Sequence, residues 1–503
     1  VVGATLVYIA GIRIWSPLKK RQKKNLPNEN PEDKKKHKRM NREMATVTYL
    51  VMALFVFMAG YVIWFLSGDT DRILNNSYNK RQDLMAERVT KGSILSDSGA
   101  VLAKTQKTGS GNEVRVYPYE GLFAHVVGRA THGKTGLEAS ESYTMLTSGI
   151  NQMTALINEL KGKKNPGNDV VTTLNLKMSQ TASEALGSHR GAVVAMEPDT
   201  GKILCMVSKP TYDPNQLEAN WERLTQASSD NSSLYNRATQ GLYPPGSTFK
   251  LYTLLEYMRE NEDFNKFSYR CTGKIGTGDG SIRCYGNEVH GKINLKQAFA
   301  ESCNAAFAQI GSGLNTKSWT KLCEQFYYNT TLPIKELEQK SSRFSLDKAS
   351  TGDIMQAAIG QGTVLTTPLQ NSFLVSAALN DGVLMKPYLV DCIQTHDGDV
   401  VTKNEPEQAK QLLSTEEAAV LRRYMRETVT SGTATALSAG SYKAGGKTGS
   451  AQYKAGSSDS HAWFVGYAVK GEKKLVVSIV VEGAGTGSAY AVPIARKIFD
   501  QYF

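Results

Sequence analysis

Cysteine is scarce in this sequence, and the cysteines that are present do not suggest a metal site. Six cysteines are spread over 503 residues, and we find none of the closely spaced Cys and His pairs that are typical of metal sites. Gly276, Gly278 and Gly280 alternate with other residues, but no helical pattern follows them as a phosphate-binding loop requires. We therefore expect neither a metal nor a cofactor.

Most of the chain also has no large excess of positive or negative charge. The net charge is +12, but the first 43 residues hold twelve Lys or Arg and four acidic residues, which leaves only +4 for the remaining 460 residues. A nucleic-acid-binding protein usually carries its excess positive charge on a folded domain, so we expect no nucleic acid partner. A short basic stretch beside a membrane span is typical of the cytoplasmic side.

A strongly apolar stretch near the start of the sequence has no charged residue. It covers residues 45–66, and Tyr61 and Trp64 lie near its end, as interfacial aromatic residues do. A helix needs about 20 apolar residues to cross a bilayer, and no cleavage pattern of small residues follows. The sequence therefore predicts a transmembrane helix at residues 44–66 that anchors the protein in the cell membrane.

The distribution of positive charge predicts the topology of this anchor. Residues 19–43 are expected to form a flexible, basic cytoplasmic linker, and residues 67–503 are expected to lie outside the cytoplasm. Residues 1–18 are largely apolar but short for a span. They fit part of a first span, the end of a preceding polytopic protein, or a simple extension, so the anchor is single-pass or two-pass.

A turn followed by a helix carries the first chemical motif. Pro244, Pro245 and Gly246 break the backbone before apolar residues spaced three to four apart, which predicts a helix that begins near Ser247. Ser247 and Lys250 are three residues apart, so their side chains share one helical face. A lysine whose pKa is lowered by burial can take the proton of a serine hydroxyl. Alone this motif is weak, because a serine with a solvated lysine nearby is common by chance.

Two further motifs follow in order. Ser302-Cys303-Asn304 begins 55 residues after Ser247, and Lys447-Thr448-Gly449-Ser450 begins 145 residues after Ser302. S-x-x-K, S-x-N and K-T-G in this order are the signature of penicillin-interacting serine acyltransferases. With these motifs the chain resembles the class B penicillin-binding proteins, and the resemblance runs from the membrane anchor to Phe503. It includes Gly360-Gln361-Gly362 and Thr367-Pro368-Leu369-Gln370.

The resemblance implies the activity of a serine-type peptidoglycan D,D-transpeptidase, which cross-links stem peptides and binds β-lactams covalently. Ser247 is then the nucleophile that attacks the penultimate D-alanine carbonyl, and Lys250 is its base. Ser302 and Asn304 relay the proton of the leaving group and hold Lys250. Cys303, between them, is interpreted as a packing residue.

The third motif is expected to bind the substrate. Lys447, on a predicted edge strand, would attract the terminal carboxylate of the substrate and lower the pKa of nearby groups. Thr448 adds a hydroxyl, and Gly449 lets the substrate backbone approach closely. The backbone N–H groups of Ser247 and Ser450 would form the oxyanion hole.

The sequence pattern predicts an α+β fold. Residues 191–196 and 202–208 read as a hairpin, residues 463–468 and 474–481 read as strands, and a helix closes the chain at residues 492–502. Strands at both ends with helices between them imply an antiparallel sheet covered by helices. This agrees with the penicillin-binding and β-lactamase-like fold that the resemblance implies.

The predicted domains are a transpeptidase domain at residues 166–503, which follows a Lys-, Gly- and Pro-rich stretch, and an extracellular pedestal at residues 67–165. The pedestal stretch from Arg88 to Gly99 resembles the family pattern, although Lys91 stands where the family usually has Arg. The pedestal has no carboxylate pattern for glycosyl transfer. The resemblance therefore implies a partner, a polytopic membrane glycosyltransferase of the cell-shape, division or sporulation type.

Three other functions use a similar set of residues. A class D-like β-lactamase shares Ser247-Thr248-Phe249-Lys250, but its Tyr-Gly-Asn motif would here precede Ser302, which is the wrong order. A β-lactam sensor is disfavoured by the pedestal, and a D,D-carboxypeptidase differs only in using water as acceptor. Cys271 and Cys284 bracket a Gly-rich stretch, residues 274–282, that is expected to form a hairpin or a loop. Both a disulfide between these cysteines and two buried thiols are compatible with the sequence.

Overall fold

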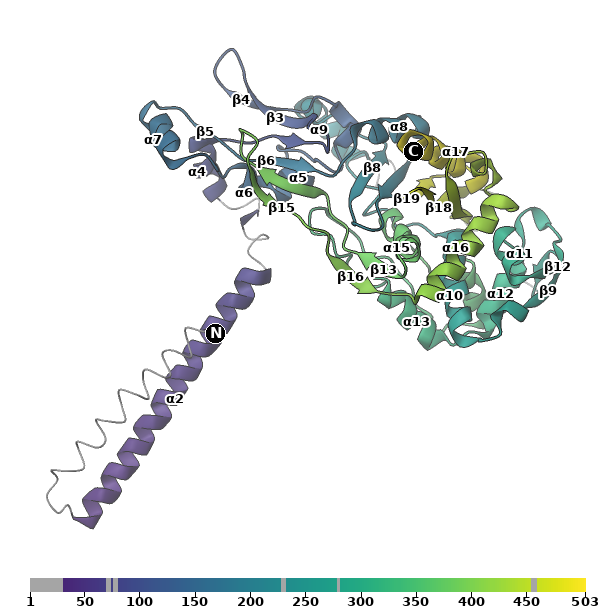
Figure 1. Ribbon diagram of the computed structural model, residues 1–503, viewed down its shortest axis with the longest axis horizontal. Helices are drawn as coiled ribbons and strands as arrows, with labels where there is room; N and C mark the ends of the chain where they lie inside the picture. The colour runs from purple at the N-terminus through teal and green to yellow at the C-terminus, as the bar shows by residue number, and fades with distance from the viewer. Residues whose placement is uncertain (1–29, 69–73, 76–79, 228–231, 278–280, 454–458) are drawn as a thin grey trace. The chain divides into compact units, whose positions relative to one another are not determined.

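The computed structural model describes residues 30–68, 74–75, 80–227, 232–277, 281–453 and 459–503, and it divides into two compact units, Val1–Ile73 and Leu74–Phe503. Figure 1 shows the elements of both units. Residues 1–18, one of the predicted segments, lie outside the described residues.

In the first unit the described residues form one helix, α2 (Pro31–Gly68, 38 residues). It is long and apolar enough to cross a membrane, and at about 1.5 Å per residue it exceeds the roughly 30 Å hydrocarbon layer. The prediction of a flexible linker up to residue 43 was wrong for residues 31–43, which are helical. Pro31 begins this helix instead of breaking it, because its fixed φ suits the first helical position, and Glu32 and Asp33 follow in the first turn.

A five-stranded antiparallel sheet organises the second unit. Its order is β17 (Lys443–Gln452), β18 (Ser460–Lys470), β19 (Lys473–Val481), β7 (Gly191–Met196) and β8 (Ile203–Lys209). The central contact joins segments that are far apart in the chain, since Val480 of β19 pairs with Ala192 of β7. The predicted strands are thus confirmed, and β17 is an edge strand as expected.

Helices cover both faces of this sheet, so the predicted α+β fold is confirmed. Neighbouring residues of β7 point to opposite faces: Val193 packs in the cluster that includes α8 (Leu176–Leu186) and α17 (Gly487–Tyr502), whereas Val194 packs in the larger cluster that includes α15 (Pro368–Leu379). All twelve residues of α15 are buried. Its first turn is the Thr367-Pro368 motif, in which the Thr367 hydroxyl accepts from the Gln370 N–H at 3.2 Å.

A second, six-stranded sheet forms the pedestal. Its order is β15 (Val400–Lys403), β14 (Val390–Gln394), β6 (Asp169–Thr172), β2 (Ile94–Leu95), β3 (Val101–Lys107) and β4 (Glu113–Val116). The predicted boundary between residues 165 and 166 cuts this sheet, because β6, β14 and β15 come from the other side of it. The composition near residue 390 does not change, so the local sequence could not reveal that β14 and β15 return to the pedestal sheet.

The pedestal also buries an ion cluster. The Glu138 carboxylate is fully buried and accepts from Lys91 Nζ at 2.7 Å and from Arg115 Nε at 2.6 Å. Burial alone raises the pKa of Glu138, but the two cations outweigh it and lower this pKa to about 2. Lys91 therefore pairs with the buried Glu138 carboxylate, as an arginine at this position could also do.

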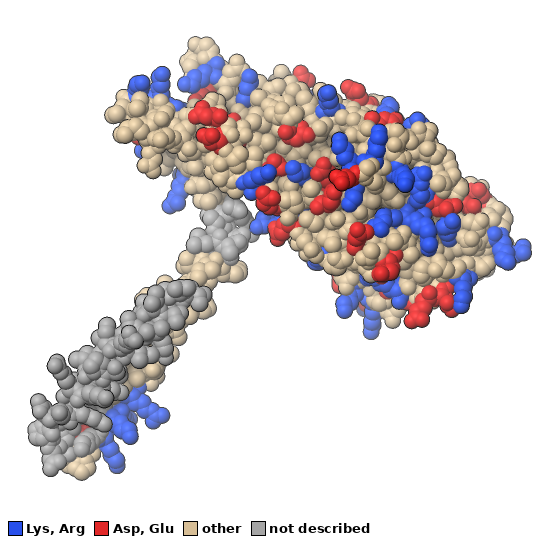
Figure 2. Space-filling view, viewed as in Figure 1, with Lys and Arg blue, Asp and Glu red and all other residues tan. Residues whose placement is uncertain are grey.

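The remaining helices and strands complete the second unit. The helices are α4 (Arg81–Arg88), α5 (Gly136–Ser140), α6 (Ser142–Met145), α7 (Gln152–Leu160), α9 (Leu217–Gln226), α10 (Lys250–Glu260), α11 (Leu295–Ala300), α12 (Asn304–Gly313), α13 (Thr316–Gln325), α14 (Thr351–Ala358) and α16 (Thr415–Thr430). The strands are β1 (Val89–Thr90), β5 (Asn165–Pro166), β9 (Ser268–Cys271), β10 (Lys274–Ile275), β11 (Ile282–Arg283), β12 (Gly291–Asn294), β13 (Val383–Met385) and β16 (Gln408–Gln411). On the face of the second unit drawn in Figure 2, basic and acidic side chains are interspersed.

Candidate active site

The S-x-x-K motif lies on a tight turn that runs into a helix. Residues Gly246–Phe249 form a 3-10 turn, and α10 begins at Lys250. Gly246 has a φ of +55° and donates its N–H to the Gly360 carbonyl at 2.9 Å. A Cβ on Gly360 would lie 2.1 Å from the Gly246 carbonyl oxygen, so this close contact requires glycine.

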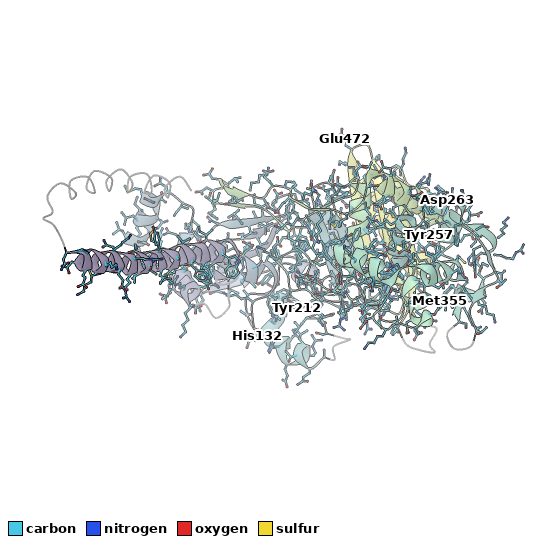
Figure 3. All side chains as sticks on the ribbon, turned by 90° about the horizontal axis from the view of Figure 1, so that it is seen from below. His132, Tyr212, Tyr257, Asp263, Met355 and Glu472 are labelled. Atoms are coloured by element: carbon cyan, nitrogen blue, oxygen red, sulfur yellow. The ribbon has the colours of Figure 1, made fainter. Side chains whose placement is uncertain are left out.

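The apolar side of α10 anchors this turn in the core. Leu251, Leu254 and Leu255 are buried, as the sequence predicts. Tyr257, which is labelled in Figure 3, lies near the far end of the helix. Its ring packs edge-on against that of Phe267, with ring centroids 5.8 Å apart. The rigid helix therefore fixes the position of Lys250 in its first turn.

Lys250 is fully buried and faces the S-x-N motif. Its Nζ donates to the Ser302 carbonyl at 2.6 Å, to Asn304 Oδ1 at 2.8 Å and to Ser302 Oγ at 3.3 Å. Burial lowers the pKa of Lys250 to about 7, against a smaller opposing effect from nearby cysteines. An appreciable fraction of this amine is therefore unprotonated at neutral pH, as a general base requires.

The S-x-N motif is held in a strained turn just before α12. Ser302 has a φ of +60°, which is uncommon for a residue with a Cβ and often marks functional sites. The Asn304 side chain connects two elements, because its Nδ2 donates to the Arg283 carbonyl at 2.9 Å while its Oδ1 accepts from Lys250. Its amide is thus oriented by the backbone of β11.

The K-T-G motif lies on the edge strand β17, beside the 3-10 turn. Lys447 is fully buried, its Nζ donates to the Thr448 carbonyl at 3.1 Å, and burial together with the Lys250 charge lowers its pKa well below the ordinary value. The Thr448 hydroxyl hydrogen-bonds to that of Thr433. A Cβ on Gly449 would lie 2.9 Å from the Pro245 carbonyl oxygen, so the glycine lets the strand approach the turn.

The three motifs converge at one cleft of about 610 Å³. Its lining includes Ser247, Asn304 and Ser450, one residue from each motif. Lys250 and Lys447 are fully buried. The arrangement offers a half-buried hydroxyl, a buried amine of lowered pKa, and an edge strand whose backbone can pair with an extended peptide.

Sequence reasoning missed part of this cleft. Tyr285, Gly286 and Asn287, which we interpreted as a chance match to a β-lactamase motif, line the cleft beside Gln361. Their position follows from the hairpin β10–β11. We expected a hairpin or a loop here, and the pairing of Lys274 with Arg283 shows that it is a hairpin. The contact between this hairpin and the S-x-N turn has no signal in the sequence.

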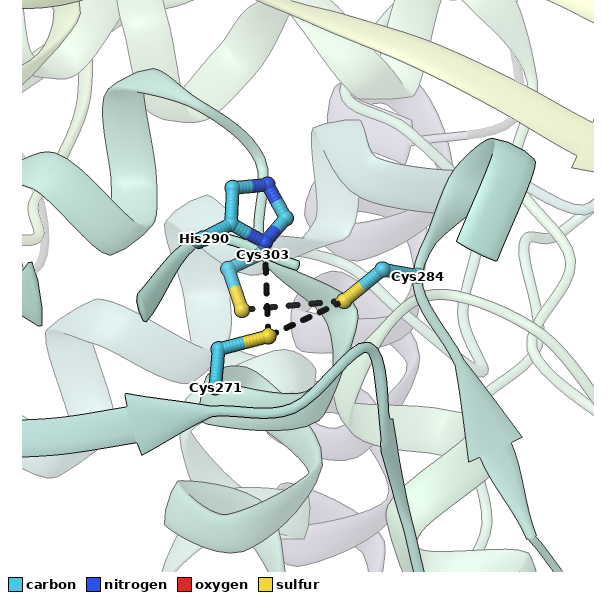
Figure 4. Close-up of side chains that lie close together, drawn as sticks. All are labelled: Cys271, Cys284, His290 and Cys303. Carbon is cyan, nitrogen blue, oxygen red and sulfur yellow. Dashed lines mark hydrogen bonds between the residues drawn. The ribbon is translucent and has the colours of Figure 1, made fainter. Parts of the chain in front are cut away.

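The prediction that the cysteines do not cluster was wrong. The Sγ atom of Cys284 lies 3.7 Å from that of Cys271 and 3.7 Å from that of Cys303, and Cys271 Sγ lies 3.4 Å from His290 Nδ1 (Figure 4). Both Cys271 and Cys284 are thiols, so the structure contains no disulfide between them. The local spacing gave no clue, because intervals of twelve, five and twelve residues separate the four side chains and only the fold brings them together.

Comparison with known proteins assigns the family. The family described as penicillin binding protein transpeptidase domain matches residues 191–500. The chain is 31% identical over 495 residues to "Peptidoglycan D,D-transpeptidase PbpA" of Mycolicibacterium smegmatis, covering 91% of this chain and 98% of that protein. It is 27% identical over 453 residues to "Peptidoglycan D,D-transpeptidase MrdA" of Acinetobacter baumannii, covering 77% and 66%.

Solved structures agree with this assignment. The D,D-transpeptidase domain of a peptidoglycan glycosyltransferase from Eggerthella lenta superimposes with a TM-score of 0.72 at 30% identity, covering 82% of this chain and 98% of that chain. Penicillin-binding protein A from Mycobacterium tuberculosis, as a ceftriaxone acyl-enzyme complex, gives a TM-score of 0.75 at 27% identity, covering 83% and 99%.

Proposed function

The chain belongs to the penicillin-binding protein transpeptidase family, and we propose that it cross-links peptidoglycan as a membrane-anchored D,D-transpeptidase with Ser247 as its nucleophile. The observation that supports this role best is the buried Lys250, whose amine is held by Ser302 and Asn304 at the cleft that Ser247 lines. β-Lactams acylate the same serine.

In the acylation step, the neutral Lys250 amine takes the proton of the Ser247 hydroxyl as Oγ attacks the carbonyl carbon of the penultimate D-alanine. The negative charge that develops on the carbonyl oxygen is stabilised by the N–H groups of Ser247 and Ser450. The C–N bond then breaks, and the proton passes through the Ser302 hydroxyl to the amine of the departing D-alanine. Ser247 is left as an ester, and Lys250 is neutral again.

The second step transfers the acyl group to an amine of another stem peptide. That amine attacks the ester carbon and gives a proton to Lys250, directly or through the Ser302 hydroxyl. The C–O bond of the ester then breaks, Lys250 returns the proton to Ser247 Oγ, and the free serine is restored. Burial lowers the pKa of the free Lys447 amine, and a substrate carboxylate beside it would favour its protonated form, which can then pair with that carboxylate. Thr448 and Gly449 bind the peptide along β17. With water as acceptor the same residues would act as a D,D-carboxypeptidase, so the acceptor decides between these two activities.

The β-lactamase alternative predicts a short-lived ester. We identify no dedicated hydrolytic Glu by motif, so the penicilloyl ester on Ser247 is expected to persist after free penicillin is removed. Intact-protein mass spectrometry at intervals measures its lifetime, and a thioester substrate with a D-amino acid acceptor separates transfer from hydrolysis. Turnover of a chromogenic cephalosporin at about 1–10³ per second would contradict the transpeptidase assignment and favour a β-lactamase.

The distribution of charge along α2 bears on how the enzyme is oriented in the membrane. Its N-terminal half carries Lys35, Lys36, Lys38, Arg39 and Arg42, and its C-terminal half is apolar. We propose that the basic half is cytoplasmic and that residues 67–503 lie outside the cytoplasm, which is supported by the usual excess of positive charge inside.

The pedestal at residues 67–165 has no carboxylate pattern for glycosyl transfer, so a source of glycan strands has to be sought outside it. We propose that residues 45–66 of α2 and the pedestal stretch from Arg88 to Gly99 bind a polytopic membrane glycosyltransferase. Much of this stretch is buried, including Val89, Ile94 and Ser96. The proposed contact therefore falls on Arg88 and Asp97, which are exposed.

The partner proposal is tested by two separate changes. Replacing residues 45–66 with an unrelated span, or substituting Arg88→Glu, is expected to reduce co-purification with the polymerase and its glycan output, while penicillin labelling remains. Lys317→Glu, an exposed charge reversal on α13, is the matched control. If both variants retain the polymerase and its output, the anchor is only a tether and the proposal fails.

A further inference from the structure

The pedestal carries a helix, α7, whose apolar residues are exposed. Met153, Leu156, Ile157 and Leu160 are spaced three and four residues apart, so they share one side of the helix. They are 65%, 51%, 42% and 79% exposed, and α7 contains no buried residue. A surface helix normally turns its apolar side towards the core, so α7 has the reverse orientation. We call these four residues the apolar side of α7.

The polar side of α7 is the one that contacts the rest of the pedestal. Ala155 and Asn158 are half-buried, and Asn158 Nδ2 donates to Asn165 Oδ1 at 2.9 Å. Asn165 is itself buried, in β5. At the start of the helix, Asn151 Oδ1 accepts from the Met153 N–H at 2.8 Å. These hydrogen bonds fix the orientation of the helix, and an exposed apolar side of this kind marks an interaction surface.

Positive charge lies directly after the apolar side. Lys161 and Lys163 follow α7 and are exposed, and Lys164 is paired with Glu113 at 2.9 Å. Glu159 is the only acidic residue in the stretch 151–164. An apolar helix side beside lysines is typical of helices that lie in the headgroup region of a bilayer, and anionic lipids strengthen their binding.

The chain keeps a bilayer within reach of the pedestal. Five residues separate the end of α2 at Gly68 from Leu74, where the second unit begins. At about 3.3–3.6 Å per residue, the chain from Gly68 to Leu74 extends over about 20 Å at most. With residues 45–66 across the membrane, as proposed above, Leu74 stays within about this distance of the end of α2.

Leu74 enters the pedestal at the end that carries α7. Its carbonyl accepts from Gln82 Nε2 of α4 at 2.7 Å. The helix α4 leads into β1, which pairs with β5, the strand that follows α7. Lys164 Nζ, between α7 and β5, donates to the Ala86 carbonyl of α4 at 2.6 Å. The elements α4, β5 and α7 therefore lie together, as they do at one end of the second unit in Figure 1.

We propose that the apolar side of α7 lies in the bilayer surface that α2 reaches, and that Lys161 and Lys163 bind the headgroups of its anionic phospholipids. The proposal rests on the span proposed for α2. It gives the pedestal a second attachment beside the five-residue tether, which limits how far the pedestal tilts over the membrane. A protein partner would have to match the four exposed side chains in shape, whereas lipid accepts them without such a match and is always within reach of the tether.

Spin labels test the position of α7 in the full chain. Cys392 is half-buried and the other cysteines are buried, so Cys392→Ser supplies a background with little labelling. In vesicles of phosphatidylglycerol and phosphatidylcholine, a nitroxide on Leu156→Cys should lie about 5–10 Å deep in the boundary between headgroups and acyl chains. Molecular oxygen should then reach it more often than a water-soluble nickel complex does. Thr154→Cys, exposed on another side of the same helix, is the matched control and should be reached by the nickel complex.

The lipid charge is tested with the same label. In vesicles of phosphatidylcholine alone, the equilibrium between docked and free α7 should shift about tenfold towards the free state, because the headgroups no longer attract the lysines. Lys161→Glu together with Lys163→Glu should cause a shift of about the same size in the mixed vesicles. Docking that is equally strong in both kinds of vesicle and with both lysines reversed would overturn the role of anionic lipid.

A second outcome decides the proposal as a whole. If the nickel complex reaches the label of Leu156→Cys as often as that of Thr154→Cys in both kinds of vesicle, α7 does not lie on the bilayer and the proposal is overturned. Penicillin labelling of Ser247 in the same vesicles is measured separately, and all α7 variants should keep the wild-type rate because α7 contributes to none of the three motifs. A failure of the docking and a failure of the proposed acylation are therefore distinguishable.

Discussion

Substitution of Ser247 by alanine is expected to abolish covalent labelling by fluorescent penicillin, which corresponds to a loss of at least about 10⁴-fold in acylation rate. The substitution removes only the hydroxyl group, and the ester cannot form without its oxygen. The fold should survive, because Ser247 is half-buried at the cleft and the neighbouring turn is held by the Gly246–Gly360 and Trp463–Pro244 hydrogen bonds, at 2.9 and 3.0 Å.

The labelling experiment has a matched control in the same cleft. Ser281→Ala removes a hydroxyl from another residue that lines the cleft. Ser281 belongs to none of the three motifs, so this variant should be labelled at a rate within about twofold of the wild-type rate. Peptide mapping of the wild-type protein should find the added mass on the peptide that contains Ser247. Labelling of Ser247→Ala at the wild-type rate would refute the nucleophile assignment and, with it, the proposed mechanism.

Much of the fold could be predicted from the sequence because its signals are local. The apolar runs at residues 191–196 and 474–481 and the turn between Pro198 and Gly201 predict strands that the structure confirms. The helix that carries Lys250 was likewise evident from its apolar spacing. The assignment of residues 31–43 to a flexible linker failed because a charged run and a proline are ambiguous: Pro31 can end a helix or begin one.

The parts that could not be predicted depend on long-range contacts. Residues 390–403 join the pedestal sheet although they are more than 200 residues from the strand they pair with, and no local pattern specifies that pairing. The same limit applies to the cluster of Cys271, Cys284, His290 and Cys303, because each residue reads as an ordinary buried side chain until the hairpin and the S-x-N turn are placed together. The roles of the site residues stay predictions, although the structure brings the three motifs to one cleft.

The largest expected effect after that of Ser247 is the loss of acylation when Lys250 becomes arginine. Arginine keeps the positive charge and can still donate to the Ser302 carbonyl and to Asn304 Oδ1, but it does not lose its proton at neutral pH. If Lys250 is the base, Lys250→Arg should lower the acylation rate by about 10²–10⁴-fold. A role limited to charge and hydrogen bonding would leave most of the rate, so this variant separates the two roles in a way that removal of the side chain cannot.

The pH dependence supplies the second test of Lys250. Its pKa is lowered to about 7 by burial, so below pH 7 the amine is mostly protonated and cannot take the serine proton. The acylation rate of the wild-type protein should therefore fall about tenfold for each unit below pH 7 and level off above it, whereas the residual rate of Lys250→Arg should lack this step. Rates from stopped-flow labelling between pH 5.5 and 8.5, with melting temperatures at each pH as the control for folding, would measure both profiles. A step that persists in Lys250→Arg would show that another group titrates, and the base would then have to be sought elsewhere in the cleft.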